Sequence, residues 1–183
     1  TMPPADFNFG FGDFAFSPDR TRLYAWGQLG WTAGSDSSYT ATLAVDAAGR
    51  ISSLQTAPCC LSESPRRDPL NTPVLISQDG GSIFIKRLRM TPESLHPAQQ
   101  TFPSEIYAIT PGGEVVATAG ALHAAATGLK LAEVPGSGGV QAITSDYARL
   151  VYFDGARRQI RTLDLAATIG MAAMGRTLTP AEG

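Results

Sequence analysis

The stretch Phe16-Ser17-Pro18-Asp19-Arg20-Thr21-Arg22-Leu23 occurs in three diverged copies along the chain. The second copy is Ile76-Ser77-Gln78-Asp79-Gly80-Gly81-Ser82-Ile83, and the third is Ile143-Thr144-Ser145-Asp146-Tyr147-Ala148-Arg149-Leu150. Each copy has an apolar residue, Ser or Thr, a variable residue, Asp, three further residues, and then Leu or Ile. Repetition at intervals of roughly 60 residues indicates a fold built from similar units.

Each copy predicts a β-hairpin in which a short strand enters, a turn follows and a second strand leaves. An Asp side chain in a turn accepts hydrogen bonds from nearby backbone N–H groups. The outgoing strands are rich in aromatic and β-branched residues, which favour pleated, buried surfaces; they cover residues 23–26, 83–85 and 150–153. We therefore expect Asp19, Asp79 and Asp146 to be structural turn residues.

A second hairpin is expected downstream of the first in residues 42–51 and again in residues 106–115, with Gly49 and Gly113 at equivalent turn positions. Two hairpins give four antiparallel strands, the size of a propeller blade. After the third copy, residues 166–174 do not have a β pattern, which predicts an incomplete last unit. The expected units cover residues 11–58, 73–120 and 139–179.

The hairpin motif resembles the TolB-like and WD-like β-propeller repeats, whose consensus is close to apolar-Ser-Pro-Asp-Gly before an apolar strand. Phe16-Ser17-Pro18-Asp19 fits this consensus best, whereas Arg20 and Tyr147 stand where those repeats usually have Gly. The resemblance implies an all-β fold of antiparallel four-stranded blades, forming a partial β-propeller or a propeller segment over residues 1–183. It implies no activity, because function depends on sites placed on a fold.

The composition excludes several classes of partner. The 183 residues carry a net charge of -2, so no basic field is present to hold a nucleic-acid backbone. No apolar run is long enough for a membrane span. The compartment is not determined by the sequence, and export to the periplasm or beyond is compatible with a chain that begins at Thr1.

No catalytic residue, metal site or cofactor is predicted. Cys59 and Cys60 are adjacent, so a disulfide between them would close a strained ring, and no second pair completes a zinc site. We interpret them as an incidental loop pair. The nucleophile-elbow and zinc-protease motifs and the phosphate- and dinucleotide-binding loops are also absent from the sequence.

Binding is expected on the propeller face that carries the long loops, because long loops on rigid scaffolds commonly bind partners. These loops cover residues 27–38, 53–72, 91–103 and 119–139. Paired guanidinium groups bind carboxylates or phosphates, and aromatic side chains anchor interfaces. The candidate binding residues are Trp31, Arg66, Arg67, His96, Phe102 and His123. Solvated loop positions, surface histidines and aromatic residues covering the core are the structural alternatives.

We expect a non-catalytic binding or assembly module that presents its long loops to a protein, peptide or carbohydrate. The alternative is a carbohydrate-active or other hydrolase or lyase that uses loop carboxylates or histidine. Because about three blades cannot close a ring, we also expect association with further blades, either from a parent chain or from another subunit. Exposed blade faces would otherwise leave large apolar patches.

Overall fold

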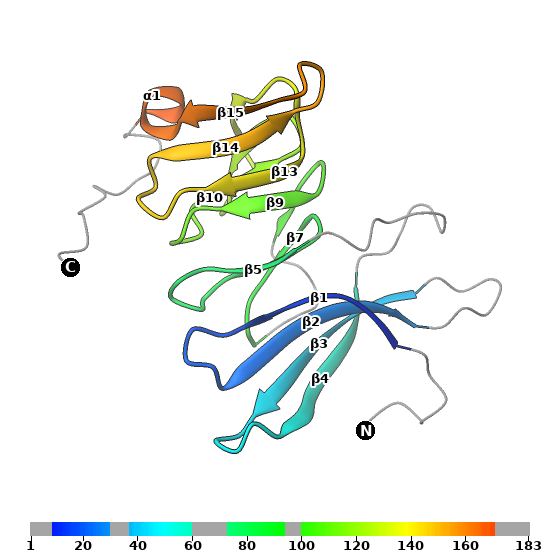
Figure 1. Cartoon of the computed structure of the whole chain (residues 1–183). Coiled ribbons are helices and arrows are strands. Elements are labelled where there is room, and N and C mark those ends of the chain that lie inside the picture. The colour runs from blue at the N-terminus through cyan, green and yellow to red at the C-terminus, as the bar shows by residue number, and fades with distance from the viewer. Residues whose placement is uncertain (1–8, 30–36, 60–72, 94–99, 171–183) are drawn as a thin grey trace. The chain divides into compact units, whose positions relative to one another are not determined.

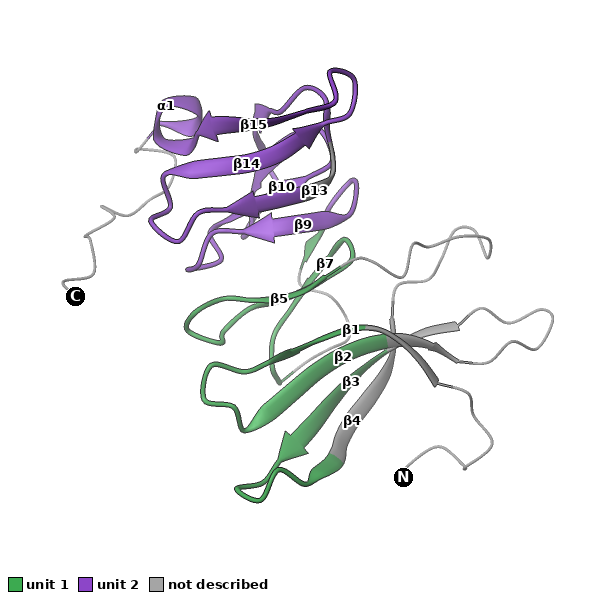
Figure 2. Ribbon diagram, viewed as in Figure 1, with its two compact units in different colours: residues 1–101 green, residues 102–183 purple. Residues whose placement is uncertain are grey.

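The computed structural model describes residues 9–29, 37–59, 73–93 and 100–170, which contain fifteen strands and one short helix (Figure 1). The prediction of an all-β protein is confirmed. The chain divides into two compact units, Thr1–Thr101 and Phe102–Gly183 (Figure 2). Every sheet in the described residues is antiparallel and has three or four strands, consistent with propeller-like blades.

The first unit contains two four-stranded sheets. The strands of the first sheet lie in the order β1 (Phe9–Phe16), β2 (Arg22–Leu29), β3 (Ser37–Val45) and β4 (Ile51–Cys59). Those of the second sheet lie in the order β5 (Val74–Ile76), β6 (Ile83–Ile85), β7 (Leu88–Met90) and β8 (Gln100–Thr101). The first strands β1 and β5 are neighbours, and the Asp13 carboxylate on β1 accepts a hydrogen bond of 2.7 Å from the Val74 N–H on β5.

The second unit contains a four-stranded sheet, a three-stranded sheet and the helix. The four-stranded sheet consists of β9 (Ile106–Ile109), β10 (Val115–Thr118), β11 (Ala121–Ala124) and β12 (Lys130–Glu133). The three-stranded sheet consists of β13 (Ser137–Ile143), β14 (Arg149–Asp154) and β15 (Gln159–Asp164), and α1 (Leu165–Ile169) follows it. The first strands β9 and β13 are neighbours, as in the first unit. Within the described residues the last sheet has three strands, and α1 lies where the sequence lacks a β pattern; residues 171–174 of that stretch lie outside the described residues.

The number of units differs from the expected three, because the described residues contain four sheets. The expected unit of residues 73–120 divides between β5–β8 and the first strands of the next sheet. The stretch 119–139 was expected to be a long loop, and it instead contains β11 and β12. That loop prediction is wrong because these short strands are rich in Ala and Leu and lack the β-branched residues that mark strands.

The turns that join the first two strands of each sheet have a common geometry; they lie between β1 and β2, β5 and β6, β9 and β10, and β13 and β14. In the first of them, the Ser17 N–H donates to the Arg22 carbonyl and the Arg20 N–H donates to the Ser17 carbonyl, both at 2.9 Å. Arg20 has a φ of 60°, and the equivalent residues Gly80, Gly113 and Tyr147 also have φ values above 60°. This left-handed conformation is easy for Gly and costs energy in other residues, which explains the Gly of the consensus at this position.

The Asp side chains lie inside these turns. Asp19 accepts the Thr21 N–H at 3.1 Å, Asp79 accepts the Gly81 N–H at 2.9 Å, and Asp146 accepts the Ala148 N–H at 3.1 Å. Each carboxylate also accepts a hydrogen bond from the hydroxyl of the Ser or Thr two residues earlier. The hydroxyl in turn accepts a backbone N–H from across the turn, so Ser or Thr and Asp act as one polar unit.

The turn between β9 and β10 has the same geometry with a different carboxylate. Thr110 takes the Ser position, and its hydroxyl donates to Glu114 at 2.9 Å. A Cβ atom added at Gly112, the Asp position, would overlap the Glu114 carboxylate. Glu114 thus fills the space that Asp fills in the other turns. Gly113 is therefore equivalent to Gly80, and its expected equivalence with Gly49, which lies in the β3–β4 turn, is wrong.

Replacing Asp79 with Ala is expected to lower the free energy of unfolding by about 1 kcal/mol, because the turn loses hydrogen bonds to the Ser77 hydroxyl and the Gly81 N–H. Glu114→Ala should cause a loss of the same order. Urea denaturation followed by circular dichroism measures both. An unchanged unfolding midpoint for both variants would contradict the structural role of the turn carboxylates.

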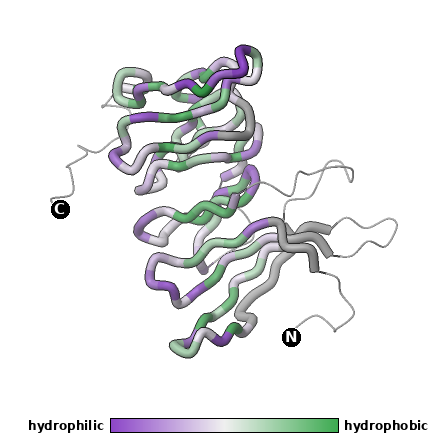
Figure 3. The backbone as a smooth tube through the Cα atoms, viewed as in Figure 1, coloured by the Kyte–Doolittle hydropathy of each residue, from purple (hydrophilic) through white to green (hydrophobic). Residues whose placement is uncertain are grey.

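Each unit has its own hydrophobic core. In the first unit, Tyr24 and Trp26 of β2 pack against Val74, Ile83, Ile85 and Met90 of the second sheet. In the second unit, core residues come from all three strands β9 to β11, from β14 and from α1. Hydrophobic residues follow the strands and hydrophilic residues gather at many of the turns (Figure 3). Sheet stacking is therefore the main source of apolar burial in each unit.

Candidate binding surface

The structure describes two of the six candidate binding residues. Trp31, Arg66, Arg67 and His96 lie outside the described residues, as do residues 30–36, 60–72 and 94–99 of the first three expected long loops. Strands β2, β3, β4 and β8 extend into other parts of those loops. Phe102 and His123 are described and are close together, with ring centroids 5.8 Å apart in an edge-to-face contact. Both side chains are buried, so this pair is part of the interior of the second unit.

His123 lies on β11, so its expected place in a long loop is wrong. Its Nδ1 atom is 3.1 Å from the Gly128 carbonyl oxygen, which can only accept, so Nδ1 carries the proton. Its Nε2 atom is 3.2 Å from the Thr118 hydroxyl. With both ring nitrogens engaged inside the unit, His123 has no nitrogen directed at a ligand.

The described carboxylates mostly hold the backbone in place. Hydrogen bonds from the Ser17 hydroxyl and the Thr21 backbone lower the pKa of Asp19, and those from Thr144 and Ala148 lower the pKa of Asp146. Asp164 caps α1 by accepting the Ala167 N–H at 2.8 Å. No group of three or more His, Cys, Asp or Glu side chains gathers at one place in the described part of the chain.

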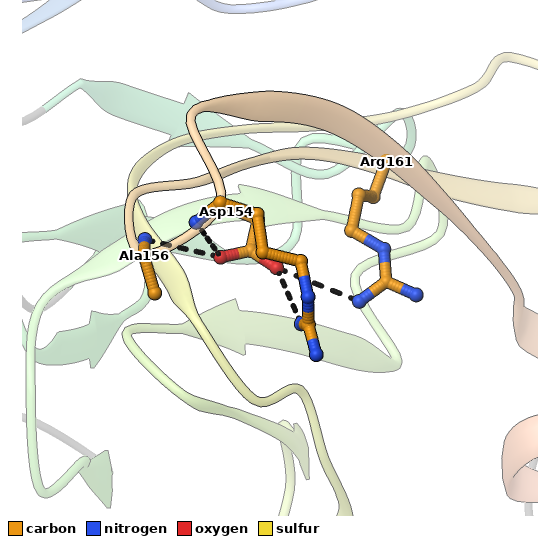
Figure 4. A network of polar contacts seen from close by, with 4 residues as sticks. Asp154, Ala156 and Arg161 are labelled. Carbon is orange, nitrogen blue, oxygen red and sulfur yellow. Dashed lines mark hydrogen bonds and ion pairs between the residues drawn. The ribbon is translucent and has the colours of Figure 1, made fainter.

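Asp154 at the end of β14 is a buried carboxylate surrounded by donors (Figure 4). It accepts the backbone N–H groups of Ala156 and Arg157, each at 3.1 Å. The guanidinium groups of Arg157 and Arg161 lie 2.9 and 3.5 Å from its Oδ2 atom. The Arg157 side chain and backbone hold the pKa of Asp154 below its ordinary value. Two cations around one anion leave this end of the sheet positively charged.

The three-stranded sheet has one buried and one exposed face. Leu150, Tyr152 and Asp154 alternate along β14 on the face that packs into the unit. Val151 and Phe153 lie on the opposite face, and Phe153 is paired across the strands with Ile160 of β15. Phe153 is 39% exposed and Ile160 is 77% exposed. This Val151–Phe153–Ile160 surface, called here the outgoing face, is an exposed apolar patch on a sheet.

The outgoing face corresponds to a buried surface in the first unit. Arg22 and Arg149 occupy the same position after the shared turn, so Trp26 is equivalent to Phe153 and Tyr24 is equivalent to Val151. Tyr24 and Trp26 are 2% and 0% exposed because they pack into the core shared with β5–β8. In the first unit a following sheet covers this surface, whereas no sheet among the described residues is packed on the equivalent surface at Phe153.

A second exposed apolar surface lies on β1–β4, called here the incoming face. Phe14 and Phe16 stack edge to face on β1 and are both about half exposed. Ile51 of β4 is exposed as well, and its cross-strand partner Val45 is half-buried. By their place before the shared turn, Phe14 and Phe16 are equivalent to Val74 and Ile76, which pack against Tyr24 and Trp26. The incoming face is therefore the kind of surface that receives a preceding sheet.

Sequence reasoning did not single out Phe153 or Ile160, although a signal was available. Residues 150–153 read Leu-Val-Tyr-Phe, so both faces of this strand are apolar. A strand that is apolar on both faces is expected to be covered on both sides.

Comparison with protein-family models finds no match, and comparison with curated proteins finds none either. In the described residues, no helix is both long and apolar enough to cross a membrane. The arrangement on the two exposed faces has the chemistry of packing surfaces, with aromatic and aliphatic side chains on rigid strands.

Proposed function

We propose that this chain is a non-catalytic assembly and binding module, and that its sheets are blades of a β-propeller similar to the TolB-like and WD-like repeats. The carrying observation is the exposure of Phe153, whose equivalent Trp26 is fully buried by a neighbouring sheet. Monomeric proteins rarely leave large apolar patches uncovered. The adjacency of first strands within each unit and the four equivalent turns support the propeller interpretation.

The partner that fits the exposed faces is another sheet of the same repeat. Inside the first unit, Val74 and Ile76 pack against Tyr24 and Trp26. Phe14 and Phe16 occupy the positions equivalent to Val74 and Ile76. Val151 and Phe153 occupy those equivalent to Tyr24 and Trp26. The incoming face of one copy therefore complements the outgoing face of another. Such a head-to-tail contact is heterologous and forms a ring if its rotation closes.

Sedimentation equilibrium of the chain alone tests this proposal. We expect association that increases with concentration, and we expect Phe16→Asp or Ile160→Asp to shift the population toward the 19.2 kDa monomer. A charge buried in an apolar contact is strongly unfavourable, whereas both side chains are exposed in the isolated chain, so folding should persist by circular dichroism.

Leu129→Asp is the matched control, because Leu129 is 65% exposed but lies in the turn between β11 and β12, on neither face. It should leave association unchanged. A folded wild-type chain that stays monomeric at all concentrations would overturn the proposal. An equal loss of association in the Leu129 variant would show that the two faces have no special role.

A further inference from the structure

In the described part of the chain, the edge of β15 that faces away from β14 has no partner strand, and it is called here the open edge. Of the described strands, only β14 pairs with β15, whereas the third strands β3, β7 and β11 of the other sheets each pair with a fourth. Within the described residues, β15 is followed by α1 and not by a fourth strand: Asp164 caps the helix, and Leu165 and Ile169 are buried in the core. An edge strand presents N–H and C=O groups that can pair with another strand.

The register identifies which groups point outward. The Leu165 N–H donates to the Ala148 carbonyl at 2.9 Å, and hydrogen-bonded pairs alternate along an antiparallel ladder. Residues 159, 161 and 163 therefore bond to β14, and the backbone groups of Ile160 and Thr162 point to the open edge. Both side chains are exposed.

In two other sheets, the residues equivalent to Ile160 and Thr162 lie beside a fourth strand. The bonds from Val45 N–H to the Thr21 carbonyl and from Ala125 N–H to the Glu114 carbonyl, both 2.8 Å, set the same register. By this register, Ile160 and Thr162 are equivalent to Thr40 and Thr42 in β3, which pair with β4. They are likewise equivalent to Gly120 and Leu122 in the sheet of β9–β12.

The fourth strand β12 shows which sequence fits this position. Its Val134 N–H donates to the Gly120 carbonyl at 2.8 Å, and Ala132 pairs with Leu122. Glu133 pairs with Ala121, whose equivalent on β15 is Arg161. On β15, therefore, the same strand would place Val beside Ile160 and Glu beside Arg161.

The charges at this edge favour an acidic residue there. The guanidinium groups of Arg157 and Arg161 both contact the Asp154 carboxylate, so these three side chains together carry one net positive charge. An acidic side chain opposite Arg161 would balance it. Apolar side chains on either side of that residue would lie beside Ile160 and extend the outgoing face.

We propose that the open edge of β15 binds an extended peptide segment of a partner protein as a fourth antiparallel strand, with an acidic residue opposite Arg161 and an apolar residue opposite Ile160. Strand addition of this kind gains affinity from backbone hydrogen bonds and specificity from alternate side chains. The inference does not depend on sheet stacking, because it concerns the edge of β15 and not its face.

The probe is a synthetic peptide with the sequence of residues 128–135, Gly-Leu-Lys-Leu-Ala-Glu-Val-Pro, which contains the fourth strand of the neighbouring sheet. It is titrated into the full chain carrying Phe16→Asp, which removes the incoming face in the other unit. Backbone NMR is expected to show the largest shifts at Ile160 and Thr162. A peptide N-methylated at the Val equivalent to Val134 should bind about tenfold more weakly, because that N–H faces the edge.

N-methylation at the Glu position is the matched control, since its N–H points away from the edge and binding should persist. A Glu-to-Lys peptide should bind more weakly to the chain, and Arg161→Ala should remove that difference. Thr162→Pro removes one outward N–H without breaking a bond to β14, and it should abolish binding. The proposal is overturned if no shifts occur, if shifts centre on Gly120 and Leu122, or if both methylated peptides bind equally.

Discussion

Trp26→Ala is expected to lower the free energy of unfolding of the first unit by about 3–5 kcal/mol, the loss typical of a large core aromatic. Trp26 is fully buried and belongs to the core that joins the two sheets of this unit. The Lys86 ammonium also lies 4.5 Å from the ring centroid. The variant therefore loses apolar contact area and the aromatic face beside a buried cation.

Chemical denaturation followed by near-ultraviolet and far-ultraviolet circular dichroism measures this loss. Trp26→Phe is the control, because it keeps an aromatic face near Lys86 and most of the apolar area, so its loss should be clearly smaller. If Trp26→Ala were as stable as the wild type, that result would contradict the packing of β2 against the second sheet described above.

Gly136→Ala is expected to destabilise the second unit strongly for two separate reasons. Gly136 has a φ of 80°, a conformation that costs about 1–2 kcal/mol for a residue with a Cβ. The added Cβ would also lie 2.6 Å from Oδ1 of the buried Asp154. Because the backbone donors of Ala156 and Arg157 fix that carboxylate, it cannot move away without losing hydrogen bonds.

Gly120→Ala separates the two reasons. Gly120 has a φ of 84°, but no atom lies within 4 Å of the added Cβ, so this variant suffers the conformational cost alone. Urea denaturation should give a clearly larger loss for Gly136→Ala. Equal losses in the two variants would contradict the close approach of Asp154 to Gly136.

The free energy of unfolding measured at acidic pH gives a second test of the Gly136 variant. Because folding lowers the pKa of Asp154 below its ordinary 3.8, the ionised group stabilises the fold above that pH. This stabilisation is lost as the pH falls from 3.8 through the lower folded pKa. Gly136→Ala displaces the carboxylate from its donors, so its stability should fall less steeply over that pH range than that of the wild type.

The parts of the fold that were predictable are those with strong local signals. The three Asp turns are visible because an apolar residue, a hydroxyl and a carboxylate keep a fixed spacing. The outgoing strands are visible because they hold aromatic and β-branched residues. These signals are enough for an antiparallel all-β fold with repeated hairpins.

The unit boundaries were missed where the local signal is weak. Residues 121–124, Ala-Leu-His-Ala, and residues 130–133, Lys-Leu-Ala-Glu, have helix-favouring composition, yet pairing with β10 places them in a sheet. The turn at Thr110 lacks Asp, so the Asp motif alone does not identify it as the first hairpin of a sheet. Thr110 and Gly113 together did carry its signature.

The chemistry of a side chain does not by itself indicate whether the fold buries it. Phe102 and His123 have side chains suited to interfaces, but burial and the hydrogen bonds of the imidazole place them inside. Phe153 and Ile160 looked like ordinary strand residues, and their exposure follows from the absence of a described strand or sheet beside them. That information is in the assembly of sheets and not in any local motif.

The turn carboxylate supplied by Glu114 has a consequence for how such repeats diverge. The Ser or Thr hydroxyl requires an acceptor at one point in space, and two positions of the chain can deliver it, through a short Asp side chain or through a longer Glu two residues later. A lineage can therefore move from one solution to the other through an intermediate that carries both acids or neither. A sequence profile that requires Asp at its fixed position would then detect fewer repeats than the protein contains. Correlated changes at the two turn positions would identify the missing repeat.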